Sequence, residues 1–342
     1  MKILHLLASN KYSGAENVVC QIIKMFESEV QMVYCSPVGE IENALKEKNI
    51  PYLPIDSLNK KEVKKVVEEY KPDIIHAHDI RASIIASAFA KQVKVVSHIH
   101  GSDKRNMGRI TPKSVLYAMV SKRFHKIICV SNSCLNEYYF KNKIKGKSVV
   151  LHNIISLDRL YEQEKTDKNT YKYEVCYLGR LSEVKNPIRA LEIMKEVVLR
   201  RPQTKCVVLG DGELKQQCEA FVNDNGLTQN IELLGFVKNP YKILKSSRVL
   251  LMSSISEGTP MALVEAFALG IPIVSTKVDG AVEIVKDKKM GSLYDSNQEA
   301  AEQVIEIIEN DKKQYVEYLT EFSKEYNDVQ SYKQKMVEIY EK

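Results

Sequence analysis

Short apolar runs alternate with longer helical patterns along most of this 342-residue chain. The short runs are rich in residues that favour strands, and the segments between them have the apolar spacing of amphipathic helices. This alternation is typical of β-α-β units, in which helices cover a sheet of parallel strands. In the first half we predict strands at 3–8, 31–36, 73–77, 93–100, 126–131 and 148–151.

The alternation is interrupted at 156–172, a polar stretch that we interpret as a linker between domains. The predicted fold is therefore α/β, with two doubly wound, Rossmann-like domains at 1–155 and 156–323. Ligands of such sheets bind at the carboxyl ends of the strands, so we expect the two domains to enclose a ligand in a cleft. In the second domain we predict strands at 174–178, 205–209, 231–234, 248–253 and 272–275, with only helical patterns after Gln298.

The composition is that of a soluble globular protein, with 44% hydrophobic residues. Its longest apolar run, near 84–90, is far shorter than the roughly 20 residues that a membrane-spanning helix needs. The seven cysteines are an odd number without C-x-x-C spacing, so we expect reduced thiols in a cytoplasmic protein. The sequence has no His/Cys cluster with zinc spacing and no Asp-x-Asp motif, so we expect neither a metal nor a cofactor.

One segment is strongly basic, although the net charge of the chain is only +6. Between 104 and 126 it has no acidic residue, and its cations are interleaved with apolar residues. A basic amphipathic helix can lie on an anionic membrane surface, and the alternative is a solvated helix beside an anionic substrate. Nucleic acid is not an expected partner, because the aromatic residues do not repeat as a stacking platform. The candidate membrane-surface residues are Lys104, Arg105, Arg109, Lys113, Lys122, Arg123 and Lys126.

One segment of the second domain combines two carboxylates with a well-marked helix start. Thr259 can cap this helix, Pro260 can be its first residue, and Gly270 can end it. Glu257 then lies just outside the helix, and Glu265 lies about two turns inside it. The free N–H groups at a helix start bind phosphate, and carboxylates accept hydrogen bonds from sugar hydroxyls. The segment therefore predicts a site for a molecule that carries both groups.

The loop after the predicted strand at 174–178 supplies two cations. Arg180 follows the strand, and Lys185 comes five residues later, at the entry to the next helix. An arginine can bind two oxygens at once and a lysine acts as a point charge, so the pair suits a diphosphate. Two surface cations near a helix start would be the simpler interpretation of the pair alone. The carboxylates at the end of another strand of the same sheet favour a binding site.

The first domain offers two further candidates. Gly14 lies in the loop after the first strand, where it would let backbone N–H groups approach a ligand, although no G-x-G-x-x-G motif is present. His100 ends the strand at 93–100, and we expect it to face the cleft and to donate a hydrogen bond to a sugar hydroxyl or to the reacting region. His98 lies on the same side of that strand and is expected to be structural.

Several short motifs follow one another in the order found in the GT4 group of retaining glycosyltransferases, which this chain resembles over nearly its whole length. The Glu-x7-Glu segment is the most specific of them. The resemblance implies a GT-B fold, with a C-terminal helix at about 324–342 that crosses back to the first domain. The motifs are Ser13-Gly14-Ala15-Glu16, His100-Gly101, Gly179-Arg180-Leu181 with Lys185-Asn186-Pro187, Gly210-Asp211-Gly212, Gly235-Phe236-Val237, and Ser256-Glu257-Gly258 through Glu265-Ala266.

The resemblance also implies how the second domain would bind a nucleotide-diphosphate-sugar donor. Arg180 and Lys185 would hold the diphosphate, and Glu265 would hold the ribose hydroxyls. The backbone near Val237 would contact the base. Leu263 is a further donor-binding candidate, and the donor sugar would be cradled by Glu257 and the backbone of Gly258, Thr259, Pro260, Met261 and Ala262.

In the first domain, the resemblance implies that Gly14 brings a helix to the phosphates and that His100 contacts the sugar near the reacting carbon. Two features depart from the family pattern. Ser13 stands where a first of two adjacent glycines is common, which implies a less close backbone approach. The residues at 153–156 read Asn-Ile-Ile-Ser instead of Asn-Gly-Val-Asp, which changes the turn that leads into the linker.

The function implied is a retaining, metal-independent transfer of a sugar from a nucleotide-diphosphate-sugar to a glycan or lipid-linked glycan acceptor, with a UDP-sugar as the first candidate among UDP-, GDP- and ADP-sugars. The setting implied is bacterial capsule, exopolysaccharide or lipopolysaccharide synthesis, in the cytoplasm or at the inner face of the membrane. The expected catalytic residues are His100, Glu257, Arg180 and Lys185. A nucleotide-sugar epimerase on the same fold and a non-catalytic sugar-nucleotide-binding partner remain as alternatives. A nicotinamide-dependent dehydrogenase would also have doubly wound domains, but the dinucleotide fingerprint is missing.

Overall fold

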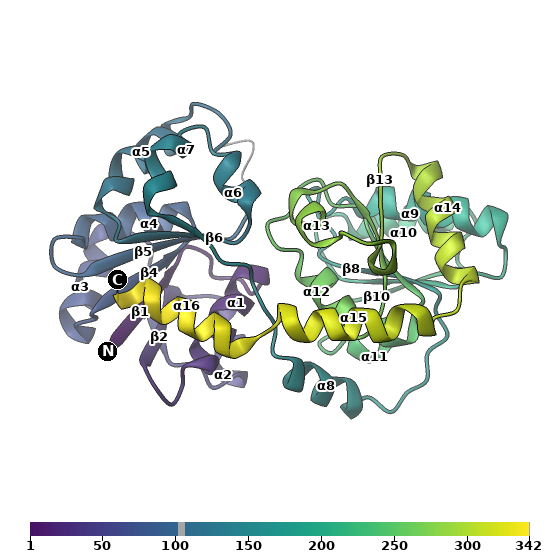
Figure 1. Cartoon of the computed structure of the whole chain (residues 1–342), viewed down its shortest axis with the longest axis horizontal. Coiled ribbons are helices and arrows are strands. Elements are labelled where there is room, and N and C mark those ends of the chain that lie inside the picture. Colours follow the sequence, from purple (N-terminus) through teal and green to yellow (C-terminus); the bar gives the residue numbers. More distant parts are fainter. Residues whose placement is uncertain (102–106, 342) are drawn as a thin grey trace. The chain divides into compact units, whose positions relative to one another are not determined.

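The computed structural model describes residues 1–101 and 107–341, and each of its two parts is a helix-covered sheet (Figure 1). The chain divides into two compact units. The first unit comprises Met1–Ile154 and Val329–Lys342, and the second unit comprises Ile155–Asp328. The domain boundaries predicted from the sequence lie at 155/156 and 323/324, whereas the units change at 154/155 and 328/329.

The first unit is built on a seven-stranded parallel sheet with the order β3-β2-β1-β4-β5-β6-β7. The sequence analysis missed β3, a four-residue strand that contains Pro54. Proline lacks an N–H donor and is tolerated at the edge of a sheet, which is where β3 lies. The strands are β1 (Lys2–Leu7), β2 (Gln31–Pro37), β3 (Tyr52–Ile55), β4 (Ile74–His78), β5 (Lys94–Ile99), β6 (Lys126–Cys129) and β7 (Ser148–Val150).

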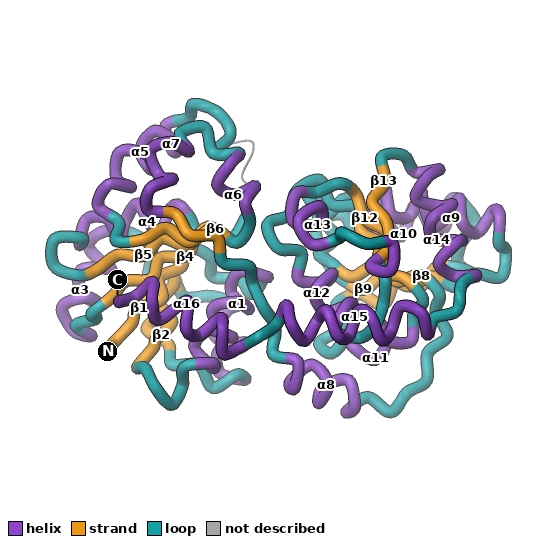
Figure 2. Tube along the Cα trace, in the orientation of Figure 1, coloured by secondary structure: helices purple, strands orange, loops and turns teal. Residues whose placement is uncertain are grey.

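Helices connect these strands and cover the sheet (Figure 2). The last helix of the chain, α16, belongs to this unit, and its Tyr332, Met336 and Tyr340 are buried. The unit therefore contains both ends of the chain. Its α-helices are α1 (Gly14–Met25), α2 (Ile41–Glu47), α3 (Lys60–Tyr70), α4 (Ile80–Ala86), α5 (Pro112–Val120), α6 (Asn132–Asn136), α7 (Lys141–Ile144) and α16 (Val329–Glu341).

The second unit is built on a six-stranded parallel sheet with the order β10-β9-β8-β11-β12-β13. The sequence analysis missed β13, a four-residue strand at the edge of this sheet. The strands are β8 (Val175–Leu178), β9 (Cys206–Leu209), β10 (Ile231–Gly235), β11 (Val249–Met252), β12 (Ile273–Thr276) and β13 (Gly291–Tyr294). The α-helices are α8 (Leu157–Thr166), α9 (Pro187–Arg200), α10 (Lys215–Asp224), α11 (Tyr241–Ser246), α12 (Met261–Ala268), α13 (Asp279–Ile284), α14 (Asn297–Glu309) and α15 (Lys313–Tyr326).

The polar stretch at 156–172 is not simply a linker, because it contains α8. Ser156 caps this helix, and Leu160 is one of its buried residues. The carboxylate of Glu164 is buried and pairs with Lys242 at 3.2 Å and with Lys245 at 3.0 Å, both on α11. Ionic contacts with another helix hold α8 in place, and the apolar spacing of a sequence does not reveal such contacts.

The basic segment is not one amphipathic helix. Thr111 caps α5, which ends at Val120, so Lys113 is the only one of the five described candidates that lies in it. Lys122 and Arg123 lie in a 3-10 turn. Of the other two described candidates, Arg109 precedes α5 and Lys126 is the first residue of β6. Lys104 and Arg105 lie outside the described residues.

All seven cysteines are buried free thiols, in agreement with the sequence analysis. Across 1–101 and 107–341, none of the helices combines the length and the hydropathy needed to cross a bilayer.

Candidate active site

The loops that follow β8 and β11 meet at the carboxyl edge of the second sheet, where these two strands are neighbours. The hydroxyl of Ser253 donates to the carbonyl of Asn186 at 2.7 Å. The N–H of Ile255 donates to the carbonyl of Val184 at 2.8 Å. The hydroxyl of Tyr177 also reaches the β8 loop, at 3.3 Å from the Arg180 carbonyl oxygen. The two loops are therefore held together as one surface.

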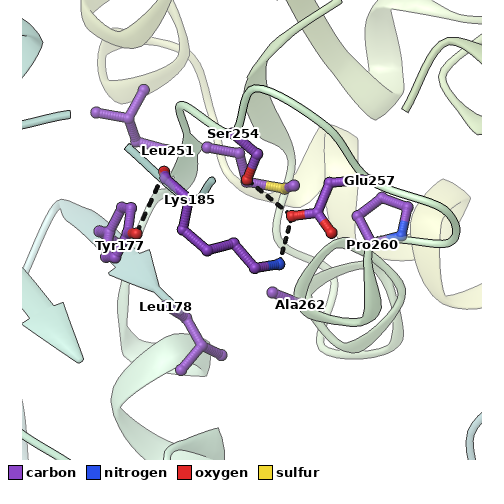
Figure 3. A pocket seen from close by; sticks show the side chains of 9 residues that line it. Tyr177, Leu178, Lys185, Leu251, Ser254, Glu257, Pro260 and Ala262 are labelled. Carbon is purple, nitrogen blue, oxygen red and sulfur yellow. Dashed lines mark hydrogen bonds and ion pairs between the residues drawn. The ribbon is translucent and has the colours of Figure 1, made fainter. Parts of the chain in front are cut away.

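These loops line a small hollow that is partly open to solvent (Figure 3). In it, the ammonium group of Lys185 forms an ion pair with Glu257, and the Ser254 hydroxyl donates to the same carboxylate oxygen at 2.7 Å. The Glu257 side chain is 10% exposed and the Lys185 side chain is 33% exposed. The carboxylate is thus held from two sides, while the cation stays accessible to an anion. The hollow is lined by Tyr177, Leu178, Lys185, Leu251, Met252, Ser254, Glu257, Pro260 and Ala262.

The helix beside the hollow, α12, begins one residue later than predicted. Pro260 has an extended backbone, with φ −73° and ψ 100°, and Met261 is the first helical residue, so Thr259 is not the cap. Leu263, a further predicted donor-binding residue, has its side chain in the core, and its N–H donates to the Pro260 carbonyl at 3.1 Å. The sugar cradle predicted at 257–262 stays a prediction. Gly270 follows the helix with φ +72°, as expected of its end.

A tight backbone contact fixes the loop in front of α12. A Cβ atom built on Gly280, in α13, would lie 1.8 Å from the carbonyl oxygen of Gly258. Only glycine allows two backbone segments to approach so closely. The position of Gly258, at the predicted sugar site, therefore depends on the absence of a side chain at position 280 of α13.

Glu265 lies on α12 and finds its polar partner on α11. The Tyr241 hydroxyl donates to Oε1 of Glu265 at 3.2 Å, and burial raises the pKa of this carboxyl to about 7. Tyr241 was missed by the sequence analysis, because a residue 24 positions away on another helix gives no local signal. Glu265 is not among the residues that line the hollow.

The lining of the hollow also lacks seven other predicted donor-binding residues, which are Gly14, Arg180, Val237, Gly258, Thr259, Met261 and Leu263. Arg180 has an exposed side chain in the loop after β8, and Val237 is partly buried just after β10. The structure therefore brings Lys185, Glu257 and the start of α12 together in one hollow. The donor roles of all the predicted residues, inside and outside this hollow, stay predictions.

In the first unit, Gly14 is the first residue of α1, and a Cβ atom built on it meets no described atom within 4 Å. His100 follows β5, and its Nε2 atom lies 2.8 Å from Nδ1 of His78. Burial lowers the pKa of His100 to about 4, so the imidazole is neutral at pH 7.

Five histidines gather in the first unit, although the sequence shows no metal-type spacing. Their ligand atoms lie within 4.8 Å of one another in two groups, His5 with His76 and His78, and His78 with His98 and His100. These residues could approach a metal. Several of their nitrogens, however, already bond to one another. Nε2 of His78 lies 2.9 Å from Nδ1 of His5, and Nδ1 of His78 lies 2.8 Å from Nε2 of His100. The detectable signal was the presence of histidine at alternate positions near the ends of two predicted strands.

Two parallel sheets covered by helices, in two Rossmann-like units, define the GT-B class of fold and confirm the predicted fold class. HepE of Anabaena, solved in complex with UDP, matches 99% of both chains with a TM-score of 0.85 and 21% identity. Two protein-family profiles cover most of the sequence, "Glycosyltransferase Family 4" at 12–159 and "Glycosyl transferases group 1" at 158–325. The chain therefore belongs to the group 1 glycosyl transferases and is a glycosyltransferase.

Curated relatives support the same conclusion. An uncharacterised glycosyltransferase of Methanocaldococcus jannaschii is 31% identical over 75% of this chain and 71% of its own. The UDP-Gal:alpha-D-GlcNAc-diphosphoundecaprenol alpha-1,3-galactosyltransferase of Escherichia coli is 26% identical over 87% and 84%. The capsular polysaccharide biosynthesis glycosyltransferase CapH of Staphylococcus aureus is 23% identical over 83% of both chains.

Proposed function

We propose that this glycosyltransferase moves a sugar from a UDP-sugar to a glycan or lipid-linked glycan, with retention of configuration and without a metal. The observation that carries the proposal is the Lys185–Glu257 pair in the hollow beside the start of α12. The name of the E. coli relative supports a UDP-sugar donor and a lipid-linked acceptor. The name of the S. aureus relative supports a place in capsular polysaccharide biosynthesis. We propose that this synthesis takes place at the inner face of the membrane.

The diphosphate of the donor would replace Glu257 as the partner of Lys185, because the diphosphate carries more negative charge than one carboxylate. The Lys185 side chain is partly exposed, so a bound anion can reach its ammonium group. Arg180, exposed in the same loop, would bind the diphosphate with its guanidinium fork. Glu265 would accept from the ribose hydroxyls, and the backbone near Val237 would contact the base. Glu257, held by Ser254, would then be free to accept from a sugar hydroxyl.

In the transfer, the bond between the anomeric carbon and the diphosphate oxygen breaks, and a bond to the acceptor oxygen forms on the same face. The acceptor proton passes to the leaving phosphate. Negative charge on the diphosphate is larger in the transition state than in the bound donor, so Lys185, Arg180 and the start of α12 would stabilise the transition state more than the donor. His100 would contact the sugar near the reacting carbon.

The test is the separate replacement of the two cations. We expect Arg180→Ala and Lys185→Ala each to lower turnover by about ten- to a hundredfold, since each removes one charged contact to the leaving group. Release of UDP from UDP-sugars in the presence of lipid-linked acceptors measures this loss. Lys172→Ala, at an exposed position of the same unit, is the matched control. Near-normal turnover in both variants would overturn the diphosphate site.

We also propose that the surface around α5 binds an anionic membrane. Ile110, Leu116 and Met119 are 64%, 44% and 63% exposed, and the exposed cations Lys122 and Arg123 follow the helix. Apolar side chains flanked by cations suit an anionic lipid surface. We expect co-sedimentation with anionic vesicles that weakens at high salt and in a Lys122→Gln/Arg123→Gln variant. Equal binding to neutral vesicles would remove the electrostatic basis.

A further inference from the structure

A continuous row of hydrogen-bonded side chains crosses the first sheet from Met32 to His100. Nε2 of His5 lies 3.3 Å from Sδ of Met32, and Nδ1 of His5 lies 2.9 Å from Nε2 of His78. Nδ1 of His78 lies 2.8 Å from Nε2 of His100. The side chains come from the adjacent strands β2, β1 and β4 and from the residue after β5. We call Met32, His5, His78 and His100 the histidine row.

The histidines of this row are neutral at pH 7. Burial lowers the pKa of His5 to about 3 and that of His100 to about 4, and it holds the pKa of His78 well below its usual range. A neutral imidazole has one N–H donor and one bare nitrogen that accepts. Each histidine of the row must therefore donate on one side and accept on the other.

Met32 sets the direction of these bonds, because a thioether sulfur has no hydrogen and can only accept. Nε2 of His5 therefore carries the proton and donates to Met32, which leaves Nδ1 of His5 to accept from His78. Nδ1 of His78 must then accept from Nε2–H of His100. The end of the row is a bare Nδ1 on His100. That atom is buried, and no residue in the described part of the chain bonds to it.

We propose that Met32, through His5 and His78, fixes His100 in the Nε2–H tautomer, so that its Nδ1 accepts a hydrogen bond from a hydroxyl of the donor sugar. This inference rests on the proposed function, in which His100 contacts that sugar. It reverses the expectation from the sequence, in which His100 donates. Met32, His5 and His78 are then positioning residues, since they act through His100.

A second chain of bonds in the same sheet shows why the thioether matters. The Tyr340 hydroxyl lies 2.9 Å from Nδ1 of His76, and Nε2 of His76 lies 3.2 Å from Nδ1 of His98. A hydroxyl both donates and accepts, so Tyr340 leaves either direction open. Only the row that ends on His100 has its direction fixed by its far end.

The experiment is nitrogen-15 NMR of histidine-labelled full-length protein, which distinguishes protonated from bare ring nitrogens. We expect the Nε2–H tautomer at His5, His78 and His100. Met32→Leu, a swap of similar volume, removes the acceptor and should shift His100 toward the Nδ1–H tautomer. We expect kcat to fall about tenfold, the worth of one hydrogen bond. Met336→Leu, at another buried methionine of the unit, should change neither.

Three outcomes separate the inference from the proposed function. An Nδ1–H tautomer at His100 in the unaltered protein, or a Met32→Leu variant without a tautomer change, overturns the inference alone. Full activity in His100→Phe overturns the sugar contact of the proposed function, whatever the tautomer. If the tautomer inference and the sugar contact of His100 are both correct, Met32→Leu should cause no further loss of activity when His100→Phe is already present. A further loss there would show that Met32 acts structurally and not through His100.

Discussion

Titratable side chains form different kinds of contact in the two sheets, neutral hydrogen bonds in the first and an ion pair in the second. At the first sheet, burial lowers the pKa of His5 and His100, and neutral rings bond to one another. At the second sheet, Lys185 and Glu257 form an ion pair in a hollow that is partly open to solvent. One edge thus offers directional bonds without charge, which suit hydroxyls, and the other offers charge, which suits a diphosphate. The same parallel-sheet plan supports both.

Acidification should have the largest effect and should act mainly on the first unit. His5 and His100 bind a proton more weakly in the folded chain than in the unfolded chain, where histidine titrates near 6.5. Their contribution to stability is present above pH 6.5 and is lost as the pH falls toward 4. At pH 5 we expect a loss of about 2 kcal/mol for each buried histidine.

Hydrogen exchange followed by mass spectrometry at pH 7 and pH 5, corrected for intrinsic exchange, reports on each unit separately. We expect protection to fall strongly in β1, β4 and β5 and much less in β8 and β11. Equal losses in the two units would break the comparison, because they would show that the buried histidines do not dominate.

The next largest effect is expected at Gly280, where the second unit has no room for a side chain. In Gly280→Ala the new methyl group would overlap the Gly258 carbonyl and displace the loop in front of α12. We expect a loss of about 3 kcal/mol in the free energy of unfolding, together with weaker binding of UDP. Thermal unfolding and calorimetric titration measure the two effects. Gly146→Ala, at a position with open space, is the control, and an unchanged UDP affinity in Gly280→Ala would contradict the prediction.

Glu265→Gln tests the opposite sign of the titration in the second unit. The Glu265 carboxyl binds its proton more tightly in the folded chain, so its contribution favours folding at low pH and is lost as the pH rises through 7. We therefore expect the variant to be more stable than the unaltered protein by about 3 kcal/mol at pH 8, and by less than about 1 kcal/mol at pH 5. Chemical denaturation at both pH values checks this. A difference that does not depend on pH would mean that the carboxyl is not desolvated.

Much of the fold was predictable because buried parallel strands are short apolar runs that periodicity detects. The exceptions were the edge strands β3 and β13, which are four residues each, and α8, which ionic contacts hold. In each case the stabilising partners lie elsewhere in the chain. The local sequence pattern of an element therefore does not predict these partners.

The candidate site was predictable only in part, for the same reason. Lys185 and Glu257 meet as expected, because the ends of neighbouring strands in one sheet must be close. The partners Tyr241 and Ser254 were not found, and neither was Met32, whose role depends on a sulfur atom that faces a histidine of the next strand. Hydrogen-bond partners across elements follow from packing, which a single sequence does not display.

The smallest effect is expected at Gly14, where stability and binding should move in opposite directions. Alanine is a better helix former than glycine, and the space around the first residue of α1 is open, so Gly14→Ala should not destabilise the first unit. If α1 approaches the phosphates of the donor, the added methyl group should weaken UDP-sugar affinity by about tenfold, or roughly 1.4 kcal/mol. Calorimetric titration with UDP-glucose, beside thermal unfolding and the Gly146→Ala control, separates the two quantities. An unchanged affinity would mean that Gly14 takes no part in donor binding. The diphosphate would then be bound by the second unit, and the proposed contact of the first unit with the donor would be His100 of the histidine row.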